Sequence, residues 1–60
     1  MKLKVIGPEN GRITLFEKTK EFLGNTKELH GVEVITGNRP DGEEIFFALV
    51  LWDEKQFRGL

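Results

Sequence analysis

Basic side chains are the residues of this sequence best suited to bind a ligand. They gather in its first third, as Lys2, Lys4, Arg12, Lys18 and Lys20. Ammonium and guanidinium groups bind phosphates, and each DNA phosphate that they neutralise releases counterions. An arginine can also pair with guanine through two hydrogen bonds, so any reading of base sequence would fall to Arg12. The alternative is that these are solvated side chains that keep an edge strand from aggregating.

Charge is distributed unevenly along the chain. Residues 1–30 hold six bases and four acids, a net charge of +2, whereas residues 31–60 hold three bases and six acids, a net charge of −3. This asymmetry predicts that an acidic partner would meet the N-terminal half. The overall net charge of −1 argues against a generic basic nucleic-acid-binding protein.

Residue types for catalysis or metal binding are few. The sequence has no cysteine and one histidine, His30, so neither a thiolate nor a histidine metal site is expected. Glu33, Glu43 and Glu44 are candidate acid–base pairs, but such catalysis needs a pocket that a chain of this size seldom encloses. Residues 7–11 lack the lysine and the long helix of a phosphate-binding loop, so their glycines indicate a turn. We therefore expect no enzyme activity, no cofactor and no metal.

Hydrophobic periodicity predicts four strands and one short helix in a single domain. Residues 2–6 and 12–15 alternate apolar with polar, and the turn residues between them predict a hairpin with one apolar and one basic face. Residues 16–23 have apolar side chains at helical spacing. Residues 32–36 and 43–52 predict a second pair of strands. The expected fold class is mainly β with one short helix, in the order β-β-α-β-β.

The last predicted strand is apolar on both faces. Its centre, IFFALVLW at residues 45–52, does not alternate, and such a strand must be covered on both sides. The short helix and the first hairpin cover one side, and each large apolar residue left exposed would cost roughly 1.5–3 kcal/mol. We therefore expect a second copy of the chain to cover the other side, in an obligate homodimer. The predicted interface residues are Ile45, Phe46, Phe47, Leu49 and Leu51.

Four short motifs occur in a recognisable order, namely GRITL at residues 11–15, EKTKEFLG at 17–24, GVEVI at 31–35 and DGEEI at 41–45. Together they resemble the AbrB/MazE-type swapped-hairpin family of DNA-binding proteins, over roughly residues 2–51. The resemblance implies one domain over residues 1–60, in which two chains interleave their hairpins into a barrel. It also implies that basic residues of the N-terminal half contact double-stranded DNA.

Within this resemblance, Arg12 matches the signature arginine of the family, and Lys20 stands where a helix arginine is usual. Lys2 and Lys4 lie on the first strand, and Phe16 replaces a proline. Family members are transcription regulators or antitoxins that repress their own operon. The resemblance therefore implies a homodimeric regulator or antitoxin-like repressor, whose partners are DNA and, for an antitoxin, a toxin.

A hypothesis of another class stays open. The acidic C-terminal half contains Trp52, Phe57 and Arg58, residue types that anchor protein interfaces, so the chain is alternatively a protein-interaction module. The longest apolar run has 8 residues, too few to cross a membrane as a helix. No apolar segment typical of a signal peptide is present, so we expect a cytoplasmic protein without a membrane partner.

Overall fold

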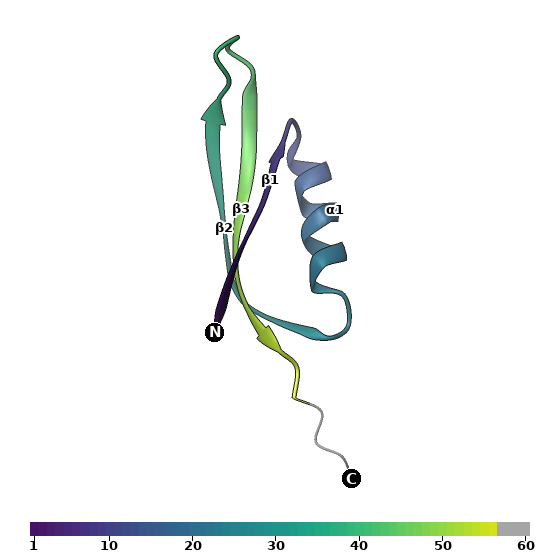
Figure 1. Cartoon of the computed structure of the whole chain (residues 1–60). Helices are drawn as coiled ribbons and strands as arrows, with labels where there is room; N and C mark the ends of the chain where they lie inside the picture. The colour runs from purple at the N-terminus through teal and green to yellow at the C-terminus, as the bar shows by residue number, and fades with distance from the viewer. Residues whose placement is uncertain (57–60) are drawn as a thin grey trace.

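In the computed structural model, which describes residues 1–56, one helix lies against one face of a three-stranded antiparallel sheet (Figure 1). The elements in chain order are β1 (Lys2–Glu9), α1 (Arg12–Leu23), β2 (Lys27–Asn38) and β3 (Glu44–Glu54). The strand order in the sheet is β1-β3-β2, so β3 is central and pairs with both others. The prediction of a mainly β fold with one short helix is confirmed.

The predicted first hairpin is wrong, because residues 12–15 form the first turn of α1 rather than a second strand. Burial on α1 falls on Leu15 and Thr19, which are four residues apart and therefore share one helix face. Ile13, the apolar neighbour that suggested a strand, is 75% exposed. The element order is thus β-α-β-β, and the sheet described is open rather than closed into a barrel.

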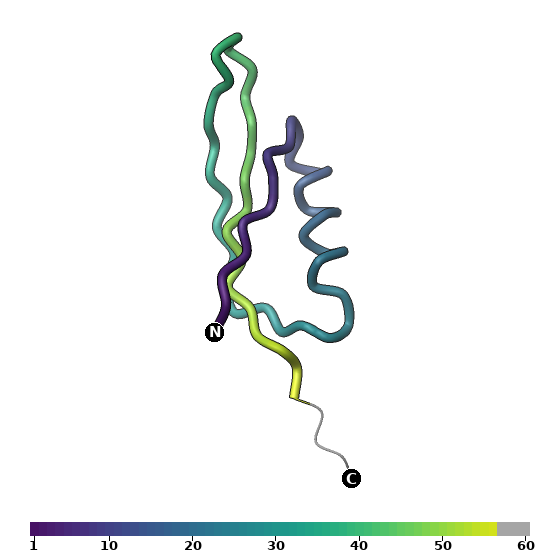
Figure 2. The backbone as a smooth tube through the Cα atoms, viewed as in Figure 1, coloured from purple at the N-terminus to yellow at the C-terminus, as the bar shows by residue number. Residues whose placement is uncertain are grey.

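The predicted second hairpin is confirmed and is longer than expected. β2 begins at Lys27, five residues before the strand predicted to start at residue 32. At the turn, the Arg39 N–H donates to the Glu43 carbonyl at 2.8 Å, and the Gly42 N–H donates to the Arg39 carbonyl at 2.9 Å. The far end of this hairpin projects beyond β1 and α1 (Figure 2).

The glycine and proline that predicted a tight turn lie within β1. Pairing with β3 runs from Lys2 opposite Trp52 to Ile6 opposite Ala48, and it resumes with a shift at Glu9 opposite Phe46. Gly7 lies at this irregularity with φ of +123°, a region that favours glycine. β1 is an edge strand, where the missing N–H of a proline is tolerated.

The hydrophobic core lies between α1 and the sheet. Its buried members are Ile6, Leu15, Phe46, Ala48 and Val50, with Phe22, Leu23 and Trp52 packed against them. Alternate residues of β3 point toward α1, which accounts for the burial of positions 46, 48 and 50. The opposite face of the sheet has no helix over it among the described residues (Figure 1).

Candidate interaction surfaces

The sheet face that points away from α1 is apolar. Residues opposite one another on paired strands share a face, and register with β3 places here the apolar set Leu3, Val5, Ile35, Ile45, Phe47, Leu49 and Leu51. We call this set the open face. Leu3 is 62% exposed and Val5 51% exposed, although both are large apolar residues. Glu33, opposite Leu49, is the one charged residue between the Ile45 and Leu51 rows.

A shallow hollow interrupts the open face at one end. Leu3, Glu33, Leu49 and Leu51 line it together with Gly31. Gly31 lies opposite Leu51 and has no side chain, and a Cβ there would meet Leu51 Cδ1 at 3.8 Å, an ordinary van der Waals contact. The face combines this hollow with the partly exposed ring of Phe47, which lies two rows away beside Gly7.

Four of the five predicted interface residues lie on the open face. The exception is Phe46, which is 7% exposed and belongs to the core of its own chain, under α1. The sequence did not separate it from its neighbours because the continuous apolar run hid the alternation of the two faces. Phe46 is therefore not available for an interface.

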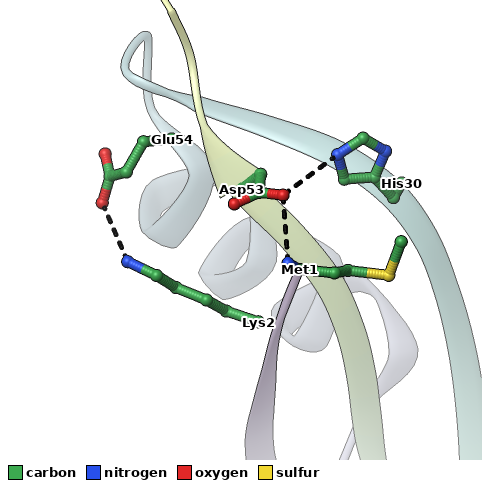
Figure 3. Close-up of polar contacts among 5 residues, drawn as sticks. All are labelled: Met1, Lys2, His30, Asp53 and Glu54. Atoms are coloured by element: carbon green, nitrogen blue, oxygen red, sulfur yellow. Dashed lines mark ion pairs between the residues drawn. The ribbon is translucent and has the colours of Figure 1, made fainter.

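Charged groups gather beyond the Leu51 end of the open face (Figure 3). Asp53 Oδ2 lies 3.2 Å from the amino group of Met1 and 3.8 Å from His30 Nε2. On the other side of the strand, Lys2 Nζ lies 3.6 Å from Glu54 Oε1. These solvent-accessible groups form a polar rim at that end.

A second partly exposed apolar strip lies between α1 and β2. Because the helix lies over β1 and β3, Val32 and Val34 on the same sheet face stay 47% and 40% exposed. Arg12, Phe16 and Thr36 line the groove beside Val34, together with the buried Leu15.

The structure separates the basic residues that the sequence placed on one surface. Arg12 lies at the N-terminus of α1, with its guanidinium carbon 5.3 Å from the centre of the Phe46 ring. Lys18 pairs with Glu9 at 2.6 Å, and Lys20 lies in the last helical turn. Since 12 helical residues rise about 18 Å, Arg12 lies near one end of α1 and Lys20 near the other.

Lys2 and Lys4 do lie together, and the structure adds Lys27 to them. Lys2 Nζ is 4.9 Å from the Trp52 ring, and Lys4 Nζ is 5.5 Å from the Phe22 ring. Lys27 Nζ lies 4.9 Å from the Phe22 ring and 5.6 Å from the Trp52 ring. The two rings meet edge to face at 5.1 Å and 87°. We call Lys2, Lys4 and Lys27 the lysine cluster.

Sequence reasoning missed Lys27 because it began the predicted strand at residue 32. Polar and apolar residues do not alternate in KELHG at the start of β2, and Lys27 and Leu29 share one face only once the strand is known to begin at Lys27. Phe57 and Arg58, proposed as partner-binding residues, lie outside the described residues.

Other kinds of site are absent from the part of the chain that the structure describes. Within residues 1–56, no group of three or more histidine, cysteine, aspartate or glutamate side chains is arranged to hold a metal ion. No helix in the same range is long and apolar enough to cross a membrane.

Comparison with known proteins gives no relative. No protein-family model matches the chain, and neither the curated proteins nor the solved structures contain a significant match. The resemblance to the swapped-hairpin family therefore stays a prediction, and function has to be argued from the surfaces themselves.

Proposed function

We propose that this chain is a non-enzymatic protein-interaction module whose open face binds a second copy of the chain in a homodimer. The observation that supports this is the exposure of large apolar side chains, Leu3, Val5 and Leu51 among them, on one continuous sheet face. Contiguous exposed apolar patches mark interaction sites in soluble proteins. An antiparallel sheet can leave one face to solvent, but that face is then polar.

The size of the open face suits a second copy. Three strands about 4.8 Å apart make it about 14 Å wide, and eight residues of β3 make it about 27 Å long. With the relief of its side chains, each copy would bury on the order of 500 Å², and two copies together about 1,000 Å². This total is near the lower limit for a specific interface, so we expect a dimer that forms at micromolar concentration.

The shape of the open face is also self-complementary. Consider a two-fold axis that lies between the two sheets and runs along the Leu49 row. It would make β3 of one copy antiparallel to β3 of the other. Phe47 of one copy would then lie over the Leu51 row of the other, where Gly31 leaves the hollow. An interface of this kind uses the same patch twice, as two-fold dimers do. Glu33 lies in the same Leu49 row, on the edge strand β2, so the axis would set it beside Glu33 of the partner subunit at the edge of the buried area, and this pair of like charges would weaken the interface.

The experiment is a mass measurement in solution. Sedimentation equilibrium at about 100 µM should give twice 6.9 kDa. Leu51→Lys should shift the chain to monomer, because it places a charge in the proposed interface. Ile13→Lys is the matched control, since Ile13 is 75% exposed on the outer side of α1, away from the open face. A wild-type chain that is folded and monomeric at this concentration would refute the homodimer and leave a different protein as the occupant.

DNA binding is the second candidate function. It is favoured by Lys2 and Lys4, which lie together as predicted, whereas the separation of Arg12 and the pairing of Lys18 with Glu9 count against it. In this candidate the chain is a transcription regulator or an antitoxin-like repressor, with a toxin as a further partner. For either candidate we propose a cytoplasmic location.

The interleaved barrel that the resemblance implies belongs to this second candidate. It requires a first hairpin, in place of which the chain has α1, so the dimer that we propose is face to face. The discriminating test is a mobility shift with random duplex DNA at low salt, which should fade steeply with added salt if DNA is bound. Arg12→Ala should weaken such a shift.

A further inference from the structure

We infer that the lysine cluster is a binding site for anions that bear two or more neighbouring phosphate groups. The cluster lies on the α1 side of the sheet, around Phe22 and Trp52, whereas the open face is on the other side. The inference therefore does not depend on the proposed homodimer. It concerns Lys27, a residue outside the basic set predicted from the sequence, as much as Lys2 and Lys4.

Lys27 shares an aromatic ring with each of the other two lysines of the cluster. Lys2 and Lys27 both lie over the Trp52 ring, and Lys4 and Lys27 both lie over the Phe22 ring. Each of these pairs shares a ring, so their nitrogens are at most about 10 Å apart, a little more than the Debye length of about 8 Å at physiological salt. Like charges at this separation repel one another, and a multivalent anion between them would relieve that repulsion.

The negative groups around the cluster do not neutralise it. Glu54 lies 3.6 Å from Lys2 and is also the cross-strand partner of Lys27, and the C-terminal end of α1 contributes about half a negative charge. Within residues 1–56, neither Lys4 nor Lys27 has an acidic side chain within ion-pair distance. Glu28 follows Lys27 on the strand and therefore points to the other face, toward its pairing partner Asp53. The cluster thus retains positive charge on a chain whose net charge is negative.

The aromatic rings position the ammonium groups without using their hydrogen bonds up. A cation over a ring is attracted by the π face, while its three N–H donors can still turn toward a ligand. The Trp52 indole N–H is buried without an acceptor among the described residues, so the lysines alone supply the donors that a ligand on the surface can reach. Edge-to-face contact between Phe22 and Trp52 fixes the platform on which the lysines lie.

Phosphate chemistry fits this arrangement better than a single carboxylate does. Three separate point charges match an anion whose charge is spread over several oxygens, and lysine binds phosphate as a point charge. A single carboxylate would neutralise one ammonium and leave the other two repelling each other. The same chemistry can come from a small polyphosphate or from the backbone of a nucleic acid, and the experiment separates these sources.

The experiment uses Trp52 as its reporter, because it is the only tryptophan in the chain. Fluorescence of the full chain is followed during titration with sodium tripolyphosphate and, separately, with a short DNA duplex, both at constant ionic strength. A saturable change with either probe is expected. Lys4→Gln and Lys27→Gln should each weaken binding about fivefold, the effect of one partly exposed ion pair.

Arg39→Gln is the matched control, since it removes the same charge at the turn between β2 and β3, far from the cluster. Binding of tripolyphosphate alone would identify a small-molecule site, and tighter binding of the duplex would identify a nucleic-acid backbone. An equal response to sodium chloride, or equal weakening by Arg39→Gln and Lys27→Gln, would overturn the inference. A parallel mass measurement shows whether the dimer has failed, since loss of the dimer leaves the lysine cluster intact.

Discussion

Replacement of Gly7 by alanine should destabilise the fold more than any other single glycine substitution that the structure lets us compare. Gly7 has φ of +123°, which L residues rarely adopt, and this alone costs about 1–3 kcal/mol. An added Cβ would lie 2.6 Å from the Phe46 carbonyl oxygen and 3.2 Å from both Phe47 Cα and Phe47 Cδ1. Two of these three atoms are backbone of the central strand, so the contact cannot be relieved by a side-chain rotation.

The total effect should reach about 3 kcal/mol when backbone strain and the contact with β3 are combined. A chain of this length has a free energy of unfolding of roughly 3–9 kcal/mol, so the variant would lose a third of it or more. In urea, with a slope of about 1 kcal/mol per molar, the midpoint should fall by about 3 M. Trp52 fluorescence reports the transition, at one protein concentration for all variants.

Gly11→Ala is the control for this prediction. Gly11 precedes α1 with φ of −138°, and a Cβ there meets nothing within 4 Å. Alanine is a weaker N-cap than glycine by less than about 1 kcal/mol, so the midpoint should move by less than about 1 M. If Gly7→Ala unfolds at the same urea concentration as Gly11→Ala, the pairing of β1 with β3 around Gly7 is not as described.

Three further substitutions test other parts of the fold in the same urea assay. Leu15→Ala should lower the free energy of unfolding by about 3 kcal/mol because Leu15 is 1% exposed, whereas Ile13→Ala should lower it by less than about 0.5 kcal/mol. Equal losses would contradict the helix and favour the strand predicted for residues 12–15. Val50→Ala should cost about 2 kcal/mol, since Val50 is fully buried on the central strand, and a cost near zero would contradict the core. Lys18→Ala should change stability by less than about 1 kcal/mol despite its 2.6 Å contact with Glu9, because Lys18 is half exposed; a larger loss would show a more buried pair.

The second hairpin could be predicted from the sequence because several independent features agree there. Residues 32–36 are rich in β-branched side chains, the next six contain the turn residues, and the run that follows is apolar. These features are all local, so this hairpin can be predicted without knowing how the rest of the chain folds. The prediction that the last strand is apolar on two faces is also confirmed, since Phe46 and Val50 point to α1 while Phe47 and Leu49 point away.

The first hairpin could not be predicted because four residues of alternation fit a strand and a helix turn equally well. Leu15 continues the strand pattern of Ile13, yet it also stands four residues before Thr19 on a helix face. Contact between α1 and the sheet decides between the two. Within the helix, the buried Thr19 donates its hydroxyl to the Leu15 carbonyl at 2.8 Å. Gly7 and Pro8 are equally ambiguous, because the same residues serve a turn and an irregular edge strand.

The lysine cluster depends on strand register, which local patterns do not supply. Lys2 reaches Trp52 only because the two residues are directly opposite in the ladder of β1 and β3, and Lys27 approaches it from the other neighbour of β3. A shift of one residue would move Lys2 and Lys4 to the open face and Leu3 to the helix side. Both candidate surfaces therefore follow from one structural fact, the register of the central strand. Residues of odd number on β3 supply the apolar face, and residues of even number supply the core and the aromatic platform. Substitutions on one face should leave the other unchanged as long as that register holds.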